Sequence, residues 1–127
     1  MVKKTKSLLS IVVPVYNEEK SLQELHHEIS RVCQEMGRPY EVIYVDDGST
    51  DSSFYRLQEI QRQDHQVKIV RLRKNFGQTA ALSAGFDYAQ GEIIISLDAD
   101  LQNDPQDFPR LLKKLEEGYD MVNGWRK

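Results

Sequence analysis

The chain alternates between short apolar runs and longer amphipathic segments, and this alternation decides its fold class. Runs rich in Val, Ile and Leu, as in strands buried on both faces, occupy 9–15, 40–45, 67–72 and 92–97, and a fifth strand is predicted at 119–123. Helices are predicted at 21–36, 52–63 and 105–117, where apolar residues recur at steps of three and four, and at 78–89, which is rich in small residues. The pattern predicts an α/β fold: a Rossmann-like, doubly wound, mostly parallel sheet with right-handed crossovers and helices on both faces.

The length of 127 residues predicts one domain, covering residues 1–127. The last predicted strand ends at residue 123, almost at the end of the chain. We therefore expect a domain that is incomplete at its C-terminus, truncated after the fifth strand. Residues 1–7, which are basic and polar, are expected to form a disordered tail.

Composition limits the partners of the chain. The net charge is −3 and no basic face is apparent, which argues against nucleic acid. The one cysteine, Cys33, excludes an internal disulfide and lies on the apolar stripe of a predicted helix, so we expect a packed thiol in a reducing compartment. No apolar stretch approaches the ~20 residues of a membrane span. We expect the chain itself to be soluble and cytoplasmic.

Acidic residues follow two of the predicted strands. Asp46 and Asp47 end the second, and Asp98 and Asp100 end the fourth. The carboxyl ends of parallel strands share one edge, where open α/β sheets bind ligands. Two acids one residue apart on an extended chain point the same way, and a divalent cation such as Mg²⁺ or Mn²⁺ relieves their repulsion. The alternative is a solvated acidic turn that caps the next helix at Asp104.

The residues at the carboxyl edge of the predicted sheet favour a nucleotide site that has no phosphate-binding glycine loop. No glycine stands between the first strand and the first helix, which argues against NAD or ATP bound in the glycine-loop modes. A metal on Asp98 and Asp100 would then anchor a diphosphate. Asp46 or Asp47 would accept from a base N–H or a ribose hydroxyl, and Tyr16 would lie against the base. The alternative for Asp46 and Asp47 is a turn with a helix cap. The alternative for Tyr16 is an aromatic side chain that ends the strand without binding a ligand.

Three motifs carry a resemblance to a known family. They are IVVPVYNE at residues 11–18, VDDGSTD at 45–51 and DADLQNDP at 98–105. In this order, at the expected strand ends, they resemble the inverting GT-A glycosyltransferases of family 2. The D-A-D-L-Q-x-x-P form and the preceding Asn75-Phe76-Gly77 resemble the branch of polyprenyl-phosphate sugar transferases, including dolichyl-phosphate mannose synthase and bacterial undecaprenyl-phosphate glycosyltransferases. The resemblance covers essentially the whole chain and implies a GT-A fold.

The resemblance also implies the residues of a nucleotide-sugar site. They are Pro14, Tyr16 and Glu18 around the base and ribose, Asp46 and Asp47 on the base, Asp98, Ala99 and Asp100 on the donor, and Arg126 on its diphosphate. Asp98, Asp100 and Gln102 would surround the divalent metal, Mg²⁺ or Mn²⁺. The implied reaction transfers a sugar, with inversion, from a UDP- or GDP-linked donor to a polyprenyl phosphate acceptor, as the metal assists departure of the nucleoside diphosphate.

No residue is assigned as a catalytic base. A lipid phosphate is ionised near neutral pH, since its second pKa is ~6, and such a nucleophile needs little help. His26 and His27 are expected at the surface of their helix, and His65 in a turn. We expect the full-length protein to lie at the cytoplasmic face of the membrane, with membrane contact through parts absent here. Apolar surface that these parts would cover leads us to expect a homo-oligomer.

Three alternatives compete with a transferase. A fragment that binds nucleotide without catalysis fits the missing acceptor half. A receiver-type phosphoacceptor domain has a similar length and paired acids, but needs its acidic pair after the first strand and its phosphorylated Asp after the third, whereas the acids here follow the second and fourth. A nucleotidyltransferase would show a loop rich in Gly, Lys and Arg after the first strand, and none is present.

Overall fold

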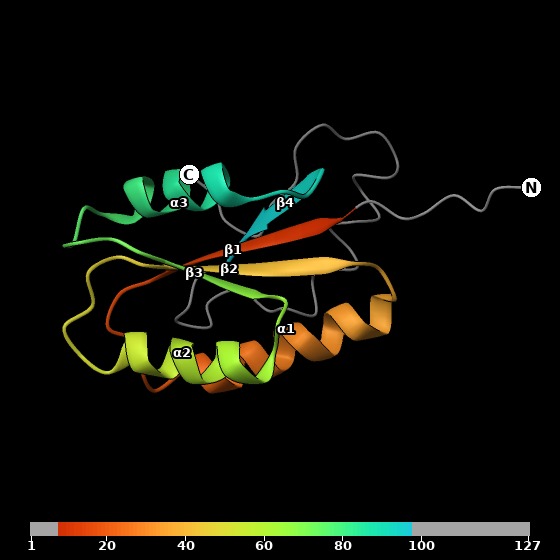
Figure 1. Cartoon of the computed structure of the whole chain (residues 1–127), viewed down its shortest axis with the longest axis horizontal. Coiled ribbons are helices and arrows are strands. Elements are labelled where there is room, and N and C mark those ends of the chain that lie inside the picture. The colour runs from red at the N-terminus through yellow and green to blue at the C-terminus, as the bar shows by residue number, and fades with distance from the viewer. Residues whose placement is uncertain (1–7, 98–127) are drawn as a thin grey trace, which may run out of the picture.

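The computed structural model describes residues 8–97, which form a four-stranded parallel sheet with helices on both faces (Figure 1). The strands are β1 (Leu9–Val15), β2 (Tyr40–Asp46), β3 (Val67–Arg71) and β4 (Ile93–Ser96). The helices are α1 (Leu22–Met36), α2 (Ser53–Gln63) and α3 (Gln78–Tyr88). The tail predicted for residues 1–7, the helix for 105–117 and the strand for 119–123 lie outside the described residues.

The strand order is β3-β2-β1-β4, so the chain returns past β1 after β3. β1 pairs with β2 from Leu9↔Tyr40 to Val15↔Asp46, and with β4 from Leu9↔Ile93 to Val12↔Ser96. This is the Rossmann order, whose direction reverses between β1 and β4. In a receiver-type sheet β1 would instead lie between β2 and β3. The receiver alternative is therefore wrong, and the predicted doubly wound fold is confirmed.

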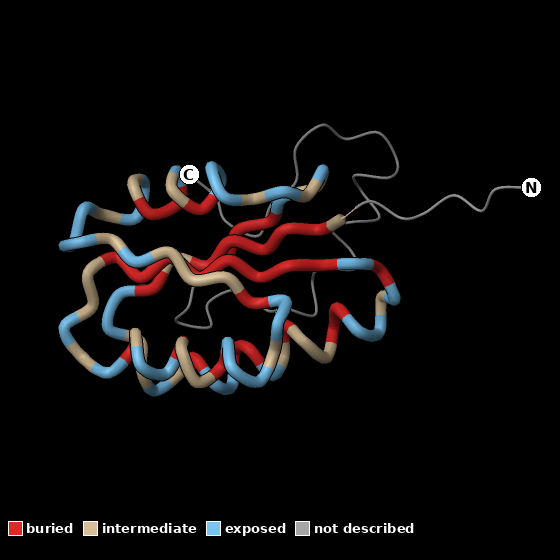
Figure 2. The backbone as a smooth tube through the Cα atoms, viewed as in Figure 1, coloured by how far each residue is buried: buried red, intermediate tan, exposed pale blue. Residues whose placement is uncertain are grey.

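Helices α1 and α2 cover one face of the sheet and α3 covers the other (Figure 1). Figure 2 shows the central strands buried between these layers. The larger apolar cluster lies beneath α1 and α2 and includes Cys33, which is fully buried. Burial raises the pKa of its thiol to about 12, so Cys33 packs as a protonated side chain, as expected from the sequence.

Helix α3 lies close to the sheet because its contact face is small. A Cβ added at Gly85 would stand 2.3 Å from Cγ1 of Val12. Ala81 and Leu82 pack with Val12 and Val45 in a smaller cluster on this face. The small residues of α3 thus bring the helix, and the loop before it, against β1 and β2.

A buried carboxylate fixes the connection from α3 to β4. Glu41 on β2 accepts hydrogen bonds from Ser10 Oγ at 2.5 Å and Gln90 N at 2.7 Å, and pairs with Lys68 Nζ at 2.6 Å. Burial acts to raise the pKa of Glu41, but the bonds from Gln90, Lys68 and Ser10 outweigh it and leave the pKa below its ordinary value. The start of β4 is thereby held in register with β1.

His26 is buried, contrary to the predicted surface position. A carboxylate only accepts hydrogen bonds, so His26 Nε2 donates to Asp64 Oδ2 at 2.9 Å, and Nδ1 accepts from the Tyr44 hydroxyl at 2.7 Å. The helical spacing carries this signal, because His26 comes four residues after Leu22 and three before Ile29 on the buried stripe of α1. The partners that satisfy the buried ring come from β2 and from the turn before β3. His27 and His65 lie nearby, at the rim of the groove described next.

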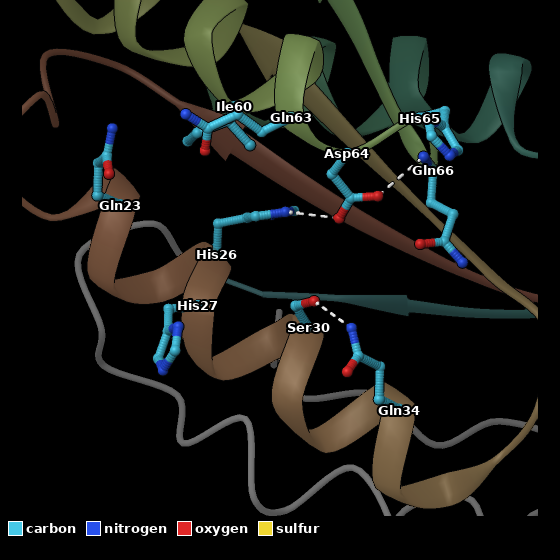
Figure 3. Close-up of a pocket in the computed structure, with 10 residues that line it drawn as sticks. All are labelled: Gln23, His26, His27, Ser30, Gln34, Ile60, Gln63, Asp64, His65 and Gln66. Atoms are coloured by element: carbon cyan, nitrogen blue, oxygen red, sulfur yellow. Dashed lines mark hydrogen bonds and ion pairs between the residues drawn. The ribbon is translucent and has the colours of Figure 1, made fainter.

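A groove of about 450 Å³ lies beside this histidine, between α1 and the end of α2 (Figure 3). Some of its polar side chains bond to the protein: Asp64 Oδ1 accepts from Gln66 N at 3.0 Å, and Gln34 Nε2 donates to Ser30 Oγ at 3.1 Å. The groove reaches residues that precede β3, away from the carboxyl ends of the strands.

In the described part of the chain, no helix is long and apolar enough to cross a membrane.

We predict that His26 makes the stability of the fold depend on pH. Burial lowers the pKa of His26 below its ordinary 6.5, although Asp64 partly opposes the shift. The unfolded chain therefore binds the proton more readily, so stability is full above about pH 6.5 and falls as the pH drops below it. Urea unfolding of the wild type from pH 7.5 to 5 should show this loss, and His26→Gln should remove it.

The exposed His65 provides the matched control, and His65→Gln should keep the wild-type dependence on pH. An equal slope in His26→Gln and the wild type would contradict the assignment.

Candidate functional site

Two loops at the carboxyl edge are joined by the side chain of Asn17. Its Oδ1 accepts hydrogen bonds from Thr50 N at 2.8 Å and Asp51 N at 3.2 Å, and its own N–H donates to Ser49 Oγ at 2.9 Å. Asn17 has a φ of 52°, a left-handed conformation that asparagine tolerates better than most residues. The loop after β1 is therefore fixed to the loop after β2.

Three more bonds extend this junction. Glu18 N donates to Ser53 Oγ at 2.9 Å and Glu19 N to Asp51 Oδ2 at 3.4 Å, while Ser52 N donates to Glu19 Oε2 at 3.2 Å. Each loop thus satisfies backbone N–H groups of the other. The junction holds Tyr16 and Glu18 at the edge of the sheet, where the Tyr16 side chain is 45% exposed. An exposed ring on a fixed loop offers a flat surface to a ligand.

Asp46 ends β2 with one carboxylate oxygen satisfied and the other not. Oδ1 accepts from Ser49 N at 3.1 Å. Oδ2 is buried and has no hydrogen-bond partner among the described residues. Among the described residues its ion-pair partner is Arg71, whose Nε lies 4.0 Å away and whose guanidinium stacks on the Phe54 ring at 3.9 Å. A buried oxygen without a donor is unfavourable, so this atom can still accept an N–H or O–H.

Asp47 differs, because both of its carboxylate oxygens are occupied. Oδ1 accepts from Phe76 N at 2.8 Å, and Oδ2 accepts from Gly77 N at 3.0 Å and Asn75 Nδ2 at 3.2 Å. From the sequence, Asp46 and Asp47 were both expected to contact the nucleotide base. The structure gives Asp47 a bond to the loop before α3, so its contact with a base stays a prediction.

The last described bond between β1 and β4 lies just before Pro14. Val15 O accepts from Asp47 N on the β2 side, and Val12 O accepts from Leu97 N on the β4 side. Pro14, two residues beyond Val12, therefore faces its nitrogen toward β4, and this nitrogen carries no hydrogen. The strand order reverses between these two strands, and open α/β sheets bind ligands at such a point.

The remaining predicted site residues follow Leu97 in the sequence. Asp98, Ala99, Asp100, Gln102 and Arg126 lie outside the described residues, so their roles stay predictions. Across residues 8–97 no group of three or more His, Cys, Asp or Glu residues is placed to hold a metal ion.

Several residues that build the site were given no role from the sequence. Arg71 was not singled out, and Asn17 and Asn75 appeared only as parts of motifs. The one usable signal was their position at, or within a few residues of, the carboxyl end of a strand. Their partners stand about 30 residues away in the chain, and spacing alone does not identify them.

Comparison with known proteins identifies the family. Residues 10–127 match the family described as Glycosyl transferase family 2. The fold is similar to that of the mannosyltransferase PcManGT from Pyrobaculum calidifontis, solved in complex with GDP-Man and Mn²⁺. The TM-score is 0.68 at 26% sequence identity, over 80% of this chain and 30% of that one.

Two further solved structures are similar. S. aureus TarS 1-349 has a TM-score of 0.66 at 26% identity, over 86% of this chain and 32% of its own. Glucosyl-3-phosphoglycerate synthase from Mycobacterium tuberculosis, solved with Mn²⁺, UDP and phosphoglyceric acid, has 0.69 at 26% identity, over 86% and 39%. The chain therefore spans 30% to 39% of the length of these three proteins. Since the family match runs from residue 10 to residue 127, this chain belongs to glycosyl transferase family 2.

Proposed function

We propose that the chain forms the nucleotide-sugar-binding part of a glycosyltransferase that moves a sugar, with inversion, from a UDP- or GDP-linked donor to a polyprenyl phosphate. The observation that carries the donor part is Asp46 Oδ2, a buried acceptor without a partner among the described residues, at the carboxyl edge. A base N–H or a ribose hydroxyl is the kind of donor that this oxygen lacks.

The described residues supply the rest of a base site. Tyr16 presents a half-exposed ring on a loop that Asn17 fixes to the loop after β2. The ring lies against the base in this proposal, and Pro14 and Glu18 line the base and ribose. The similar mannosyltransferase was solved with GDP-Man and the similar synthase with UDP, which supports a nucleotide donor here.

A divalent metal, Mg²⁺ or Mn²⁺, fits the residues that follow β4. Leu97 is buried and hydrogen-bonded to Val12 O at the carboxyl end of β4, and the sequence continues directly with Asp98 and Asp100. Carboxylate oxygens are ligands that these hard cations prefer. Asp98, Asp100 and Gln102 would hold the ion, which when bound supplies a Lewis acid that stabilises negative charge on the leaving diphosphate. Both PcManGT and the synthase were solved with Mn²⁺.

The protein side chains bind and orient in this mechanism. Asp46 and Tyr16 fix the nucleoside, and Arg126 contacts the diphosphate and stabilises its charge. The proposed acceptor is already ionised near neutral pH, with a second pKa of ~6, so no general base is assigned. The polyprenyl phosphate, and with it a place at the cytoplasmic face of a membrane, rests on the motif D-A-D-L-Q-x-x-P and on Asn75-Phe76-Gly77.

A domain that binds the nucleotide without catalysis is the second candidate, because the chain spans at most 39% of the three similar proteins. Incubation with a radiolabelled UDP- or GDP-sugar and undecaprenyl phosphate separates the two candidates. Labelled lipid supports the transferase, and nucleotide binding without product supports the binding domain.

We predict nucleotide binding that depends on metal. Calorimetric titration with UDP and GDP should show binding in Mn²⁺ and at least tenfold weaker binding in EDTA. Asp98→Ala and Asp100→Ala should cause a comparable loss, because each removes a charged ligand of the ion. Asp87→Ala, at an exposed position late in α3, should bind as the wild type does. Equal affinity with and without metal would contradict the proposed anchor.

We predict opposite effects of Asp46→Asn on binding and stability. The amide oxygen keeps the bond from Ser49 N, while the buried oxygen without a partner loses its charge. The free energy of unfolding without ligand should stay unchanged or rise by about 1 kcal/mol. Affinity for UDP or GDP should fall about tenfold or more, because a hydrogen bond to a charged group is lost. Unchanged affinity in calorimetry would exclude Asp46 from the site.

A further inference from the structure

The loop of residues 73–77, between β3 and α3, is held by the carboxylate of Asp47, which follows β2. Asp47 is 3% exposed, and its carboxylate accepts hydrogen bonds from the backbone N–H groups of Phe76 and Gly77 and from Asn75 Nδ2. Asn75 Nδ2 also reaches the backbone oxygen of Asp47 at 3.2 Å. A base N–H would have to compete with these three donors for a carboxylate that they already satisfy.

Gly48 fixes the same loop independently. A Cβ added at Gly48 would lie 2.3 Å from the carbonyl carbon of Lys74 and 2.4 Å from the nitrogen of Asn75. Gly48 also has a φ of +71°, which favours glycine. The two backbones are therefore in direct contact, and a side chain at residue 48 would push the loop away.

The 73–77 loop begins next to Asp46, the residue whose Oδ2 we assign to the nucleotide base. Leu72, directly before the loop, donates its N–H to the backbone oxygen of Asp46 at 2.9 Å. From the fixed backbone project Lys74 and Phe76; the Phe76 side chain is 49% exposed, with Lys74 Nζ 5.2 Å from its ring centroid. The loop is thus positioned to close the β3 side of a base bound at Asp46.

We infer that Asp47 is a positioning residue: with Gly48 it holds the 73–77 loop as the outer wall of the base site, and it does not contact the nucleotide itself. The inference rests on the proposed function, because the wall matters only if a base binds at Asp46. The two adjacent aspartates then have different roles. Asp46 Oδ2 accepts a hydrogen bond from the ligand, and both carboxylate oxygens of Asp47 accept hydrogen bonds from the loop.

A double-mutant cycle distinguishes positioning from direct contact. In Asp47→Asn the amide group faces backbone N–H donors, so the amides of Phe76 and Gly77 should exchange hydrogen faster and UDP should bind about tenfold more weakly. Gly48→Ala, which leaves the carboxylate untouched, should have a similar effect on both. The double variant should be no weaker than the weaker single variant, because both changes displace one loop.

Asp87→Asn, a matched change at an exposed site in α3, should bind UDP and exchange as the wild type does. Circular dichroism checks folding, and Asn75→Ala replaces Gly48→Ala in the cycle if the strained variant does not fold. Losses that multiply to about a hundredfold, or normal binding in Asp47→Asn despite faster exchange, would overturn the inference alone. A wild-type chain that binds no nucleotide would overturn the proposed function and the inference with it.

Discussion

The missing N–H of Pro14 is the constraint on which the proposed site depends. Pro14 stands where β1 would donate to the carbonyl oxygen of Leu97, and without an N–H it cannot form this bond between β1 and β4. The strand order reverses between the same two strands. Asp98 and Asp100 follow directly in the sequence. A donor at position 14 would add one more hydrogen bond to the ladder between the two strands.

The loops at the carboxyl edge are held by one recurring device. A short polar side chain from one loop accepts hydrogen bonds from backbone N–H groups of another. Asn17 binds the loop after β2 in this way, and Asp47 binds the loop after β3. Loops carry few apolar contacts, so these bonds supply the order that a packed core supplies elsewhere. Three loops from three strands become one surface, from which Tyr16 and Phe76 project.

The elements were predictable from the sequence because their signals are local. Alternating apolar runs and helical stripes placed the seven described elements to within a few residues, and the carboxyl edge followed from parallel pairing. The site was predictable only as an edge. Which oxygen of which aspartate stays free depends on donors about 30 residues away, as for Asp47 and Phe76. The spacing of α1 places His26 on the buried stripe, but the partners that satisfy its ring, Tyr44 and Asp64, come from other elements and could not be identified.

The central claim is that a metal-bound nucleotide lies at the carboxyl edge, beside β1. Mn²⁺ broadens the NMR signals of nearby amides, whereas Mg²⁺ does not, so an isotope-labelled chain with UDP or GDP reports the position of the metal directly. Replacing Mg²⁺ by Mn²⁺ should broaden the amide signals of Tyr16, Asp46 and Leu97, and should leave Gly37, His65 and Gly91 at the opposite edge sharp. Broadening centred on the groove beside His65 and Gln66 would contradict the account.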